Sequence, residues 1–165
     1  LKIEAWYNAF MPGLGEDFVK NILDDYIIIR TNFYGFHSEE NFLFNWVLKN
    51  LKNKQPIIGF SDVMFNPLEI RNLINMIYEL MNKDFMGIIH LASNEVISKY
   101  EFGLKIANIF NLDPQLVIKD SIKNFESTAK RPMNTSLSNN KSKKILKTKT
   151  CSLDYSLKKI KKQFF

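Results

Sequence analysis

Residues suited to binding a ligand stand at the end of one short apolar run. The run "YIIIRT", residues 26–31, has the β-branched and aromatic composition of a strand that is covered on both faces. In open α/β sheets, ligands bind at the carboxyl ends of the strands. The candidate binding residues at this end are Arg30, Thr31, Asn32, Phe33 and Tyr34. A second interpretation stays open, in which Phe33 and Tyr34 are core aromatic residues at a strand end.

Arg131 is a candidate from a different part of the chain. Its planar guanidinium group matches the oxygens of a phosphate, and Pro132 favours an extended backbone at this position. Contact with a diphosphate or a sugar is one interpretation, and a structural salt bridge is the other. Asn134 and Ser136 are expected to hold the loop through hydrogen bonds between side chain and backbone.

The cysteine and the histidines predict neither a disulfide nor a metal site. Cys151 is the single cysteine, and His37 and His90 are isolated, so no metal-ligand spacing occurs. His90 lies within an apolar run and is expected to be a sheet residue, whereas His37 is only weakly placed for binding. Because one cysteine cannot form an internal disulfide, a reducing, cytoplasmic location is expected.

The positive charge is concentrated at one end of the chain. The net charge is +6, but residues 141–165 contain nine lysines and one acidic residue, so this segment alone carries +8. The remaining residues therefore carry −2. A lysine-rich segment without interleaved aromatic residues is typical of a solvated surface. We expect neither nucleic acid nor a membrane as a partner, and a small basic interaction protein acting through residues 141–162 is an alternative function.

Apolar periodicity predicts helices that alternate with strands. Ser98 and Glu101 have the spacing of a capping box, and Asn66 with Pro67 is placed to start a helix. Strands separated by helices indicate an α/β fold with a parallel sheet. The expected strands are 26–31, 56–60, 87–92 and 115–120, and the expected helices are 16–24, 41–51, 66–82, 98–112 and a last one with Leu153, Leu157, Ile160 and Phe164 on one side.

The sequence lacks the loop that receives a dinucleotide. A nucleotide-binding α/β domain carries closely spaced glycines after its first strand, where a helix N-terminus meets the phosphates. The six glycines here are scattered, and Gly13 and Gly15 follow no strand. Any cofactor-binding half would therefore lie outside these residues.

Three segments, in order along the chain, match motifs of one enzyme family. Residues 26–35, "YIIIRTNFYG", resemble I-L-R-T-S-W-V-Y-G. Residues 87–112, "GIIHLASNEVISKYEFGLKIANIFNL", resemble a G-I-Y-H-L-S-G strand followed by an s-x-Y-E-F-A helix. Residues 129–146, "AKRPMNTSLSNNKSKKIL", resemble A-x-R-P-x-N-S-x-L-D-x-S-K-L. The chain thus resembles the dTDP-4-dehydrorhamnose reductases, a branch of the extended short-chain dehydrogenase/reductases, over residues 14–146.

This resemblance implies a sugar-nucleotide reductase of the deoxysugar pathway that uses NADPH or NADH. The chain would supply its second half, the C-terminal part of a Rossmann-like parallel sheet plus a small substrate-binding lobe. The implied ligand is a nucleotide-sugar of the dTDP type. The expected boundaries are a divergent stretch at 1–13, a partial Rossmann-type domain at 14–146 and a basic C-terminal helix at 147–165.

The resemblance also implies roles for individual residues. Phe33 stands where the family has a tryptophan, which keeps the apolar face but loses the indole N–H. Asp62 and Pro67 fit part of a family segment written D-Q-x-G-x-P-T. Thr31 and Asn32 would contact the cofactor, NADP or NAD. The implied substrate-binding residues are Arg30, Thr31, Asn32, Phe33, Tyr34, Asp62 and Arg131.

The family's catalytic pair is not matched. The family uses YxxxK, in which the tyrosine protonates the sugar and the lysine lowers the tyrosine pKa, and Gly-Glu follows. Gly15-Glu16 fits that Gly-Glu, which places Asn8 at the tyrosine position and Pro12 at the lysine position. A register that uses Tyr7 puts Met11 at the lysine position. We expect no catalytic residue, no activity and no bound cofactor in this chain alone, and a non-catalytic nucleotide-sugar-binding or regulatory module is the alternative.

A partial sheet also predicts an unusual surface. Without the strands that precede it in the family, the strand at 26–31 would have an open edge and an apolar face without its covering elements. We therefore expect exposed hydrophobic surface around this strand. Homo-oligomerisation or association through the sheet edge would follow from it.

Overall fold

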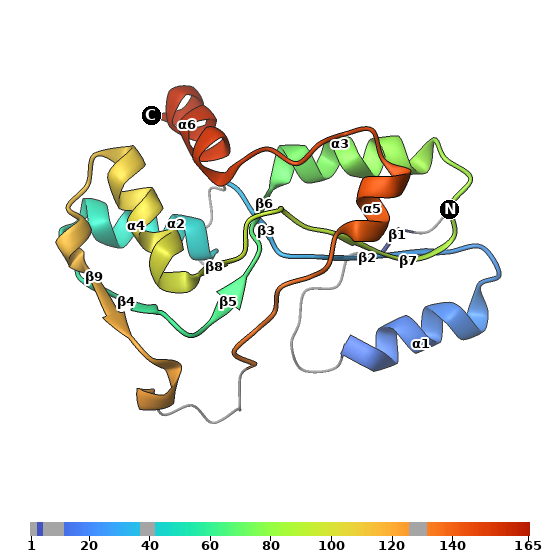
Figure 1. Ribbon diagram of the computed structural model, residues 1–165, viewed down its shortest axis with the longest axis horizontal. Coiled ribbons are helices and arrows are strands. Elements are labelled where there is room, and N and C mark those ends of the chain that lie inside the picture. Colours follow the sequence, from blue (N-terminus) through green and yellow to red (C-terminus); the bar gives the residue numbers. More distant parts are fainter. Residues whose placement is uncertain (1–2, 5–11, 37–41, 126–131) are drawn as a thin grey trace.

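The computed structural model describes residues 3–4, 12–36, 42–125 and 132–165. Two lobes lie side by side (Figure 1), a parallel sheet with helices on both faces and a smaller lobe of strands and helices. The predicted fold class, α/β with a Rossmann-like parallel sheet and a small lobe, is confirmed. Among the described residues, no helix is both long and apolar enough to cross a membrane.

The larger lobe contains a three-stranded parallel sheet in the order β1-β2-β7. α3 lies on one side of β2 and β7, and α1 lies on the other (Figure 1). Ile27 and Ile29 pack in one core cluster with Leu73, Met76 and Leu80 of α3. The elements are β1 (Ile3–Glu4), α1 (Pro12–Ile22), β2 (Ile27–Thr31), α3 (Ile70–Met81), β7 (Gly87–Leu91) and α5 (Asn140–Ile145).

The expected hydrophobic surface around residues 26–31 is not found in the strand itself. Ile27, Ile28 and Ile29 are only 2%, 6% and 4% exposed. For the strand itself the expectation is wrong, because β1 and β7 pair with both edges of β2 and helices cover both faces. Exposed apolar side chains do lie on the neighbouring helix α1, where Phe18 is 64% and Ile22 is 70% exposed. Association through the sheet edge stays a prediction.

The smaller lobe is built on two parallel strands, β4 and β9. Ile57 and Val117 from these strands share one core cluster with Phe102 of α4. Gly59 lets α4 approach β4, since a Cβ there would lie 2.7 Å from the Cα of Tyr100. The elements are α2 (Leu43–Lys52), β4 (Ile57–Phe60), α4 (Lys99–Phe110), β9 (Val117–Asp120) and α6 (Leu153–Phe164), with the short 3₁₀ helices η1 (Pro114–Leu116) and η2 (Ile122–Asn124).

Two short strand pairs connect the lobes. β3 (Phe33–Tyr34) pairs in parallel with β6 (Leu68–Glu69). β5 (Met64–Phe65) pairs antiparallel with β8 (Ile97–Ser98). Neither pair was predicted, because a two-residue strand leaves no periodicity in the sequence.

Two predicted helix starts have different outcomes. The capping box of α4 is confirmed, because the Ser98 hydroxyl accepts the Glu101 N–H and the Glu101 carboxylate accepts the Ser98 N–H. The predicted start of α3 at Pro67 is wrong, since this helix begins at Ile70 and Glu69 caps it. The physical reason is that β6 stays extended in order to pair with β3.

Glu79 holds the linker between α5 and α6 against α3. Its carboxylate oxygens accept the backbone N–H groups of Lys147 and Thr148 at 2.7 and 2.8 Å. The Lys83 ammonium group lies 3.4 Å away. The hydrogen bonds from the linker lower the pKa of Glu79 from 4.5 to about 2.

This pKa predicts an acid dependence of stability. Because the folded-state pKa is the lower one, the contribution of Glu79 is complete above about pH 4.5 and is lost as the pH falls through about 2. Glu79→Gln is therefore expected to lower the urea midpoint at neutral pH and to have little effect at the acid end. Asp84→Asn, at an exposed position, is the control. A Glu79→Gln effect of equal size at all pH values would contradict this prediction.

Candidate functional site

Asn66 joins three segments at the carboxyl end of β2. Its Oδ1 accepts hydrogen bonds from the Asn32 side chain at 3.2 Å and from the Leu137 N–H at 3.0 Å. Its Nδ2 donates to the carbonyl groups of Ser93 and Leu137 at 3.2 and 2.8 Å. Asn66 is 2% exposed. Its predicted role as a helix cap is wrong, because this buried network uses the whole side-chain amide.

The loop at 132–139 is held against the ends of the strands. The Thr135 N–H donates to the Met64 carbonyl at 2.9 Å, and the Thr135 carbonyl accepts the Asn32 side chain at 2.8 Å. The Asn139 side chain donates to the Ala92 carbonyl, just beyond β7, at 3.1 Å. Residues far apart in sequence are therefore fixed at one edge of the sheet, the edge where α/β folds bind ligands.

Side chains within this loop behave as the sequence predicts. The Ser136 N–H and hydroxyl both donate to Asn134 Oδ1, at 2.9 and 2.7 Å. His90 is a sheet residue of β7, and its Nδ1 lies 3.2 Å from the Ser138 carbonyl.

Arg30 is engaged in a two-point ion pair with Glu16. Its Nε and Nη2 donate to the two carboxylate oxygens at 2.7 and 2.5 Å. Hydrogen bonding from Arg30 lowers the pKa of Glu16. The pair connects β2 to α1 through the acid of Gly15-Glu16, and the Arg30 side chain is still 44% exposed. Arg30 thus has a structural partner at the position where substrate binding is predicted.

Tyr34 is a core residue of the smaller lobe. It is 5% exposed, and its ring lies 5.4 Å from the Phe102 ring and 6.0 Å from the Phe44 ring. Burial raises the pKa of its hydroxyl, and the nearby Ser156 hydroxyl opposes that rise. No hydrogen bond of acceptable geometry reaches the Tyr34 oxygen from the described residues. These contacts favour the core interpretation of Tyr34.

Thr31 and Phe33 remain at the strand end with groups suited to a ligand. The Thr31 Oγ1 is buried, and the described residues give it no hydrogen-bond partner. Phe33 is partly buried and packs against the core of the larger lobe. A buried hydroxyl without a partner is uncommon in proteins, so a ligand acceptor is one way to satisfy Thr31.

Asp62 serves the turn that follows β9. Its carboxylate accepts the Ser121 hydroxyl at 2.5 Å and the Ile122 N–H at 2.9 Å. These hydrogen bonds lower the pKa of Asp62. Among the described residues, no hydrogen bond or ion pair joins Asp62 to Asn32 or Thr31, so its predicted substrate contact stays a prediction.

Several predicted residues lie outside the described part of the chain. Arg131 is among them, so its contact with a diphosphate stays a prediction. The same holds for His37 and for the positions compared with the catalytic pair, Tyr7, Asn8 and Met11.

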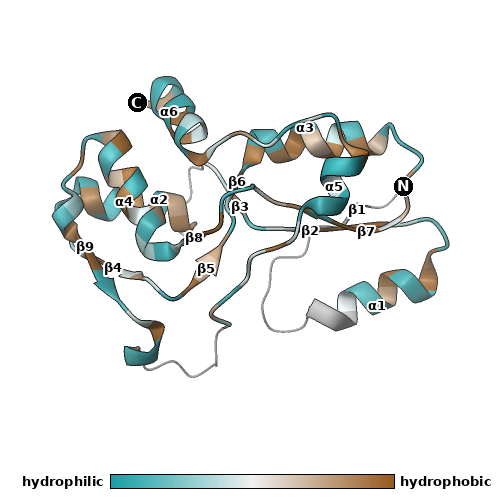
Figure 2. Ribbon diagram, in the orientation of Figure 1, coloured by the Kyte–Doolittle hydropathy of each residue, from teal (hydrophilic) through white to brown (hydrophobic). Residues whose placement is uncertain are grey.

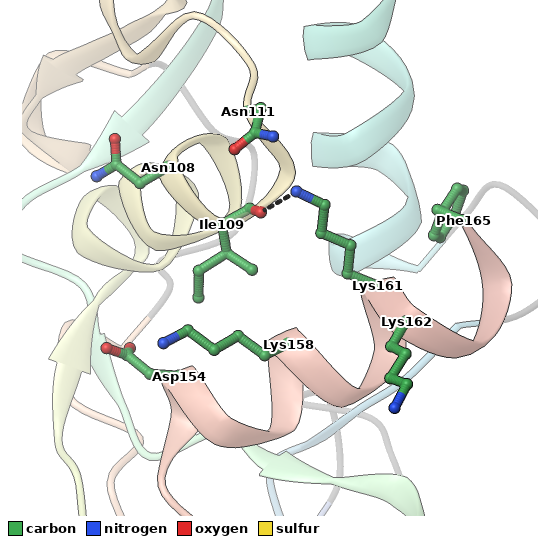
Figure 3. Close-up of a pocket in the computed structure, with 8 residues that line it drawn as sticks. All are labelled: Asn108, Ile109, Asn111, Asp154, Lys158, Lys161, Lys162 and Phe165. Carbon is green, nitrogen blue, oxygen red and sulfur yellow. Dashed lines mark hydrogen bonds between the residues drawn. The ribbon is translucent and has the colours of Figure 1, made fainter.

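A separate hollow of about 710 Å³ lies between α4 and α6. Figure 3 shows its lysines on α6 and the hydrogen bond of 2.7 Å from Lys161 to the Ile109 carbonyl. Lys158 and Lys162 are exposed, and the colouring of α6 in Figure 2 is largely hydrophilic. The hollow shares no residue with the network around Asn66, and its lysines form a solvated face.

The parallel sheet and the second lobe define a Rossmann-like α/β protein, with a buried polar network at the carboxyl edge of the sheet. The dTDP-4-dehydrorhamnose reductase of Bacillus anthracis, solved in complex with NADP, has a TM-score of 0.79 and 25% identity, covering 88% of this chain and 51% of that chain. A hypothetical dTDP-4-dehydrorhamnose reductase of Sulfolobus tokodaii has a TM-score of 0.71 and 34% identity, covering 87% and 50%.

Residues 13–165 match the sequence family described as the RmlD substrate binding domain, and the chain belongs to this family. A curated relative is the probable low-salt glycan biosynthesis reductase Agl14 of Haloferax volcanii, which is 26% identical over 127 residues. That match covers 74% of this chain and 42% of the relative. The chain therefore spans about half the length of the proteins it resembles, and the predicted resemblance is confirmed.

Proposed function

We propose that this chain binds the nucleoside diphosphate portion of a dTDP-type nucleotide-sugar at the carboxyl end of β2 and does not reduce the sugar on its own. The observation that carries the proposal is the Asn66 network, which brings Asn32 and the loop at 132–139 together at this edge. Membership of a substrate-binding-domain family supports it. Thr31 supplies a buried hydroxyl that none of the described residues pairs with, and Phe33 supplies a ring for the base or sugar.

Reduction would require groups that this chain does not supply. By resemblance, Asn8 and Pro12 occupy the positions of the proton-donating tyrosine and its lysine. The sequence also has no closely spaced glycines after a strand, the feature that receives the phosphates of NADP or NAD. Hydride transfer would therefore belong to an assembly that includes a cofactor-binding half. The alternative is that the chain takes part in no reduction at all and has only a nucleotide-sugar-binding or regulatory role.

Calorimetric titration of the chain with dTDP-rhamnose, dTDP and NADPH tests this function. Saturable binding of the first two and none of NADPH is expected, with no NADPH oxidation when a 4-dehydro sugar is added. Thr31→Val removes one hydrogen bond and is expected to weaken dTDP-rhamnose binding about fivefold. Thr31→Ser keeps the hydroxyl and is the matched control. A wild-type chain that binds neither dTDP compound would contradict the proposal.

A further inference from the structure

Lys99 occupies an unusual position at the junction of the lobes. It is the first residue of α4 and directly follows β8, which lies with β5 between the small lobe and the sheet (Figure 1). Its N–H donates to the Val63 carbonyl at 3.0 Å. This hydrogen bond continues the antiparallel pairing of β5 with β8 by one residue. The residue is thereby anchored to the β5–β8 pair.

The surroundings of the Lys99 side chain are apolar. Its Nζ lies 3.3 Å from the centre of the Phe65 ring. Phe65, Ile97 and Val63 are 4%, 8% and 9% exposed. The described residues provide this ammonium group with no hydrogen bond and no ion pair. Burial lowers the pKa of Lys99 to about 8, and the positive end of the α4 dipole also disfavours a cation here.

Other lysines of intermediate exposure have polar partners. Lys105 lies 2.5 Å from the Asp154 carboxylate, and Lys83 lies 3.4 Å from Glu79. Lys161 donates to a helix carbonyl. Among the described residues, the Lys99 ammonium group therefore faces an aromatic ring and no polar partner, and groups perturbed in this way are candidates for functional sites.

The proposed binding edge lies across β5 from Lys99. On one side of β5, Met64 pairs with Ser98, next to Lys99. On its other side, Met64 bridges to Asn134, and its carbonyl accepts the Thr135 N–H. Neighbouring strands lie about 4.8 Å apart, so only about two such spacings separate Lys99 from the loop that binds Asn32. A nucleoside diphosphate is long enough to reach both.

We infer that the Lys99 ammonium group binds the diphosphate of the nucleotide-sugar, with its stem held against Phe65. This inference rests on the proposed function. Lysine acts as a compact point charge toward phosphate oxygens, and a half-buried ammonium interacts with them more strongly than a solvated one. The ligand would supply the counter-charge that the surrounding side chains do not.

Titrations with dTDP and with thymidine, which has no phosphate, test the inference. Lys99→Met is expected to weaken dTDP binding about tenfold and to leave thymidine binding unchanged. Lys99→Arg should restore part of the dTDP affinity. The control is Lys119→Met, which removes the same charge from an exposed lysine whose Nζ lies 5.9 Å from the Tyr100 ring. This control is expected to bind dTDP like the wild type.

Proton uptake gives a second readout that does not depend on the stability of a variant. The pKa of Lys99 in the chain without ligand is about 8, and a bound phosphate group would raise it. The wild-type chain should therefore take up protons when dTDP binds at about pH 8. Titration in buffers of different ionisation enthalpy measures this uptake. Binding of dTDP without proton uptake, or with equal affinity in Lys99→Met, would overturn the role of Lys99 and leave the proposed function standing. Absence of dTDP binding to the wild type would overturn both.

Discussion

Replacing Asn66 with alanine is expected to lower the free energy of unfolding by about 3 kcal/mol. The Asn66 side chain is buried and makes four hydrogen bonds, two as acceptor and two as donor. Each buried group left without a partner costs about 1–3 kcal/mol, and water entering the vacated space offsets part of the sum. For a chain of this size, the melting temperature would fall by roughly 6–12 °C.

Urea and thermal unfolding of Asn66→Ala measure this loss. Asn75→Ala is the matched control, because Asn75 is exposed on α3 and alanine is the better helix former. The control should be as stable as the wild type or slightly more stable. A loss below about 1 kcal/mol in Asn66→Ala would mean that the loop at 132–139 is not held by this amide. Weaker dTDP-rhamnose binding is expected alongside the loss of stability, since the same amide positions Asn32.

Local sequence signals were sufficient to predict features whose interacting residues lie close together in the sequence. The capping box at Ser98 was predictable because both of its hydrogen bonds join residues three apart. The strand at 26–31 was recognisable from its continuous apolar composition. The helix expected at 16–24 begins earlier, at Pro12, since proline suits the first helical position, where its missing N–H has no helical acceptor.

Contacts between distant segments were not predictable in the same way. Asn66 and Leu137 are 71 residues apart, and a polar residue before a proline has the local appearance of a helix cap. Arg30 and Glu16 were both visible as charged residues, but no periodicity showed that they form an ion pair. The resemblance to the reductase family drew attention to residues 129–146 without indicating the asparagine amides that hold the loop at 132–139.

Which strands pair with one another was also not predictable from the sequence. Alternation of strands and helices predicts parallel pairing, and both longer pairs are parallel, β2 with β7 and β4 with β9. The alternation does not say which strands are neighbours, because each crossover is compatible with several positions in a sheet. The separation of the longer strands into the sheets β1-β2-β7 and β4-β9 therefore became visible only in the fold.

Replacing Leu157 with alanine is expected to cost about 3 kcal/mol of stability. Leu157 lies on α6 and is 0% exposed. It belongs to one core cluster with Phe102 and Ile106 of α4, which are also 0% exposed. Truncation would leave a cavity between the two helices, and the loss combines the missing apolar contact with the cost of that cavity.

This substitution also tests whether the basic C-terminal helix expected at 147–165 unfolds separately from the rest of the chain. A separate helix could lose Leu157 without changing the urea midpoint of the rest of the chain. The packing of α6 against α4 instead predicts one cooperative transition that shifts as a whole, with an unchanged slope. Lys158→Ala, at the exposed neighbouring position, should leave the midpoint within about 0.5 kcal/mol of wild type. Because the apolar side of α6 completes the core of the smaller lobe, Lys158, Lys159 and Lys162 are left exposed on the remaining surface of this helix.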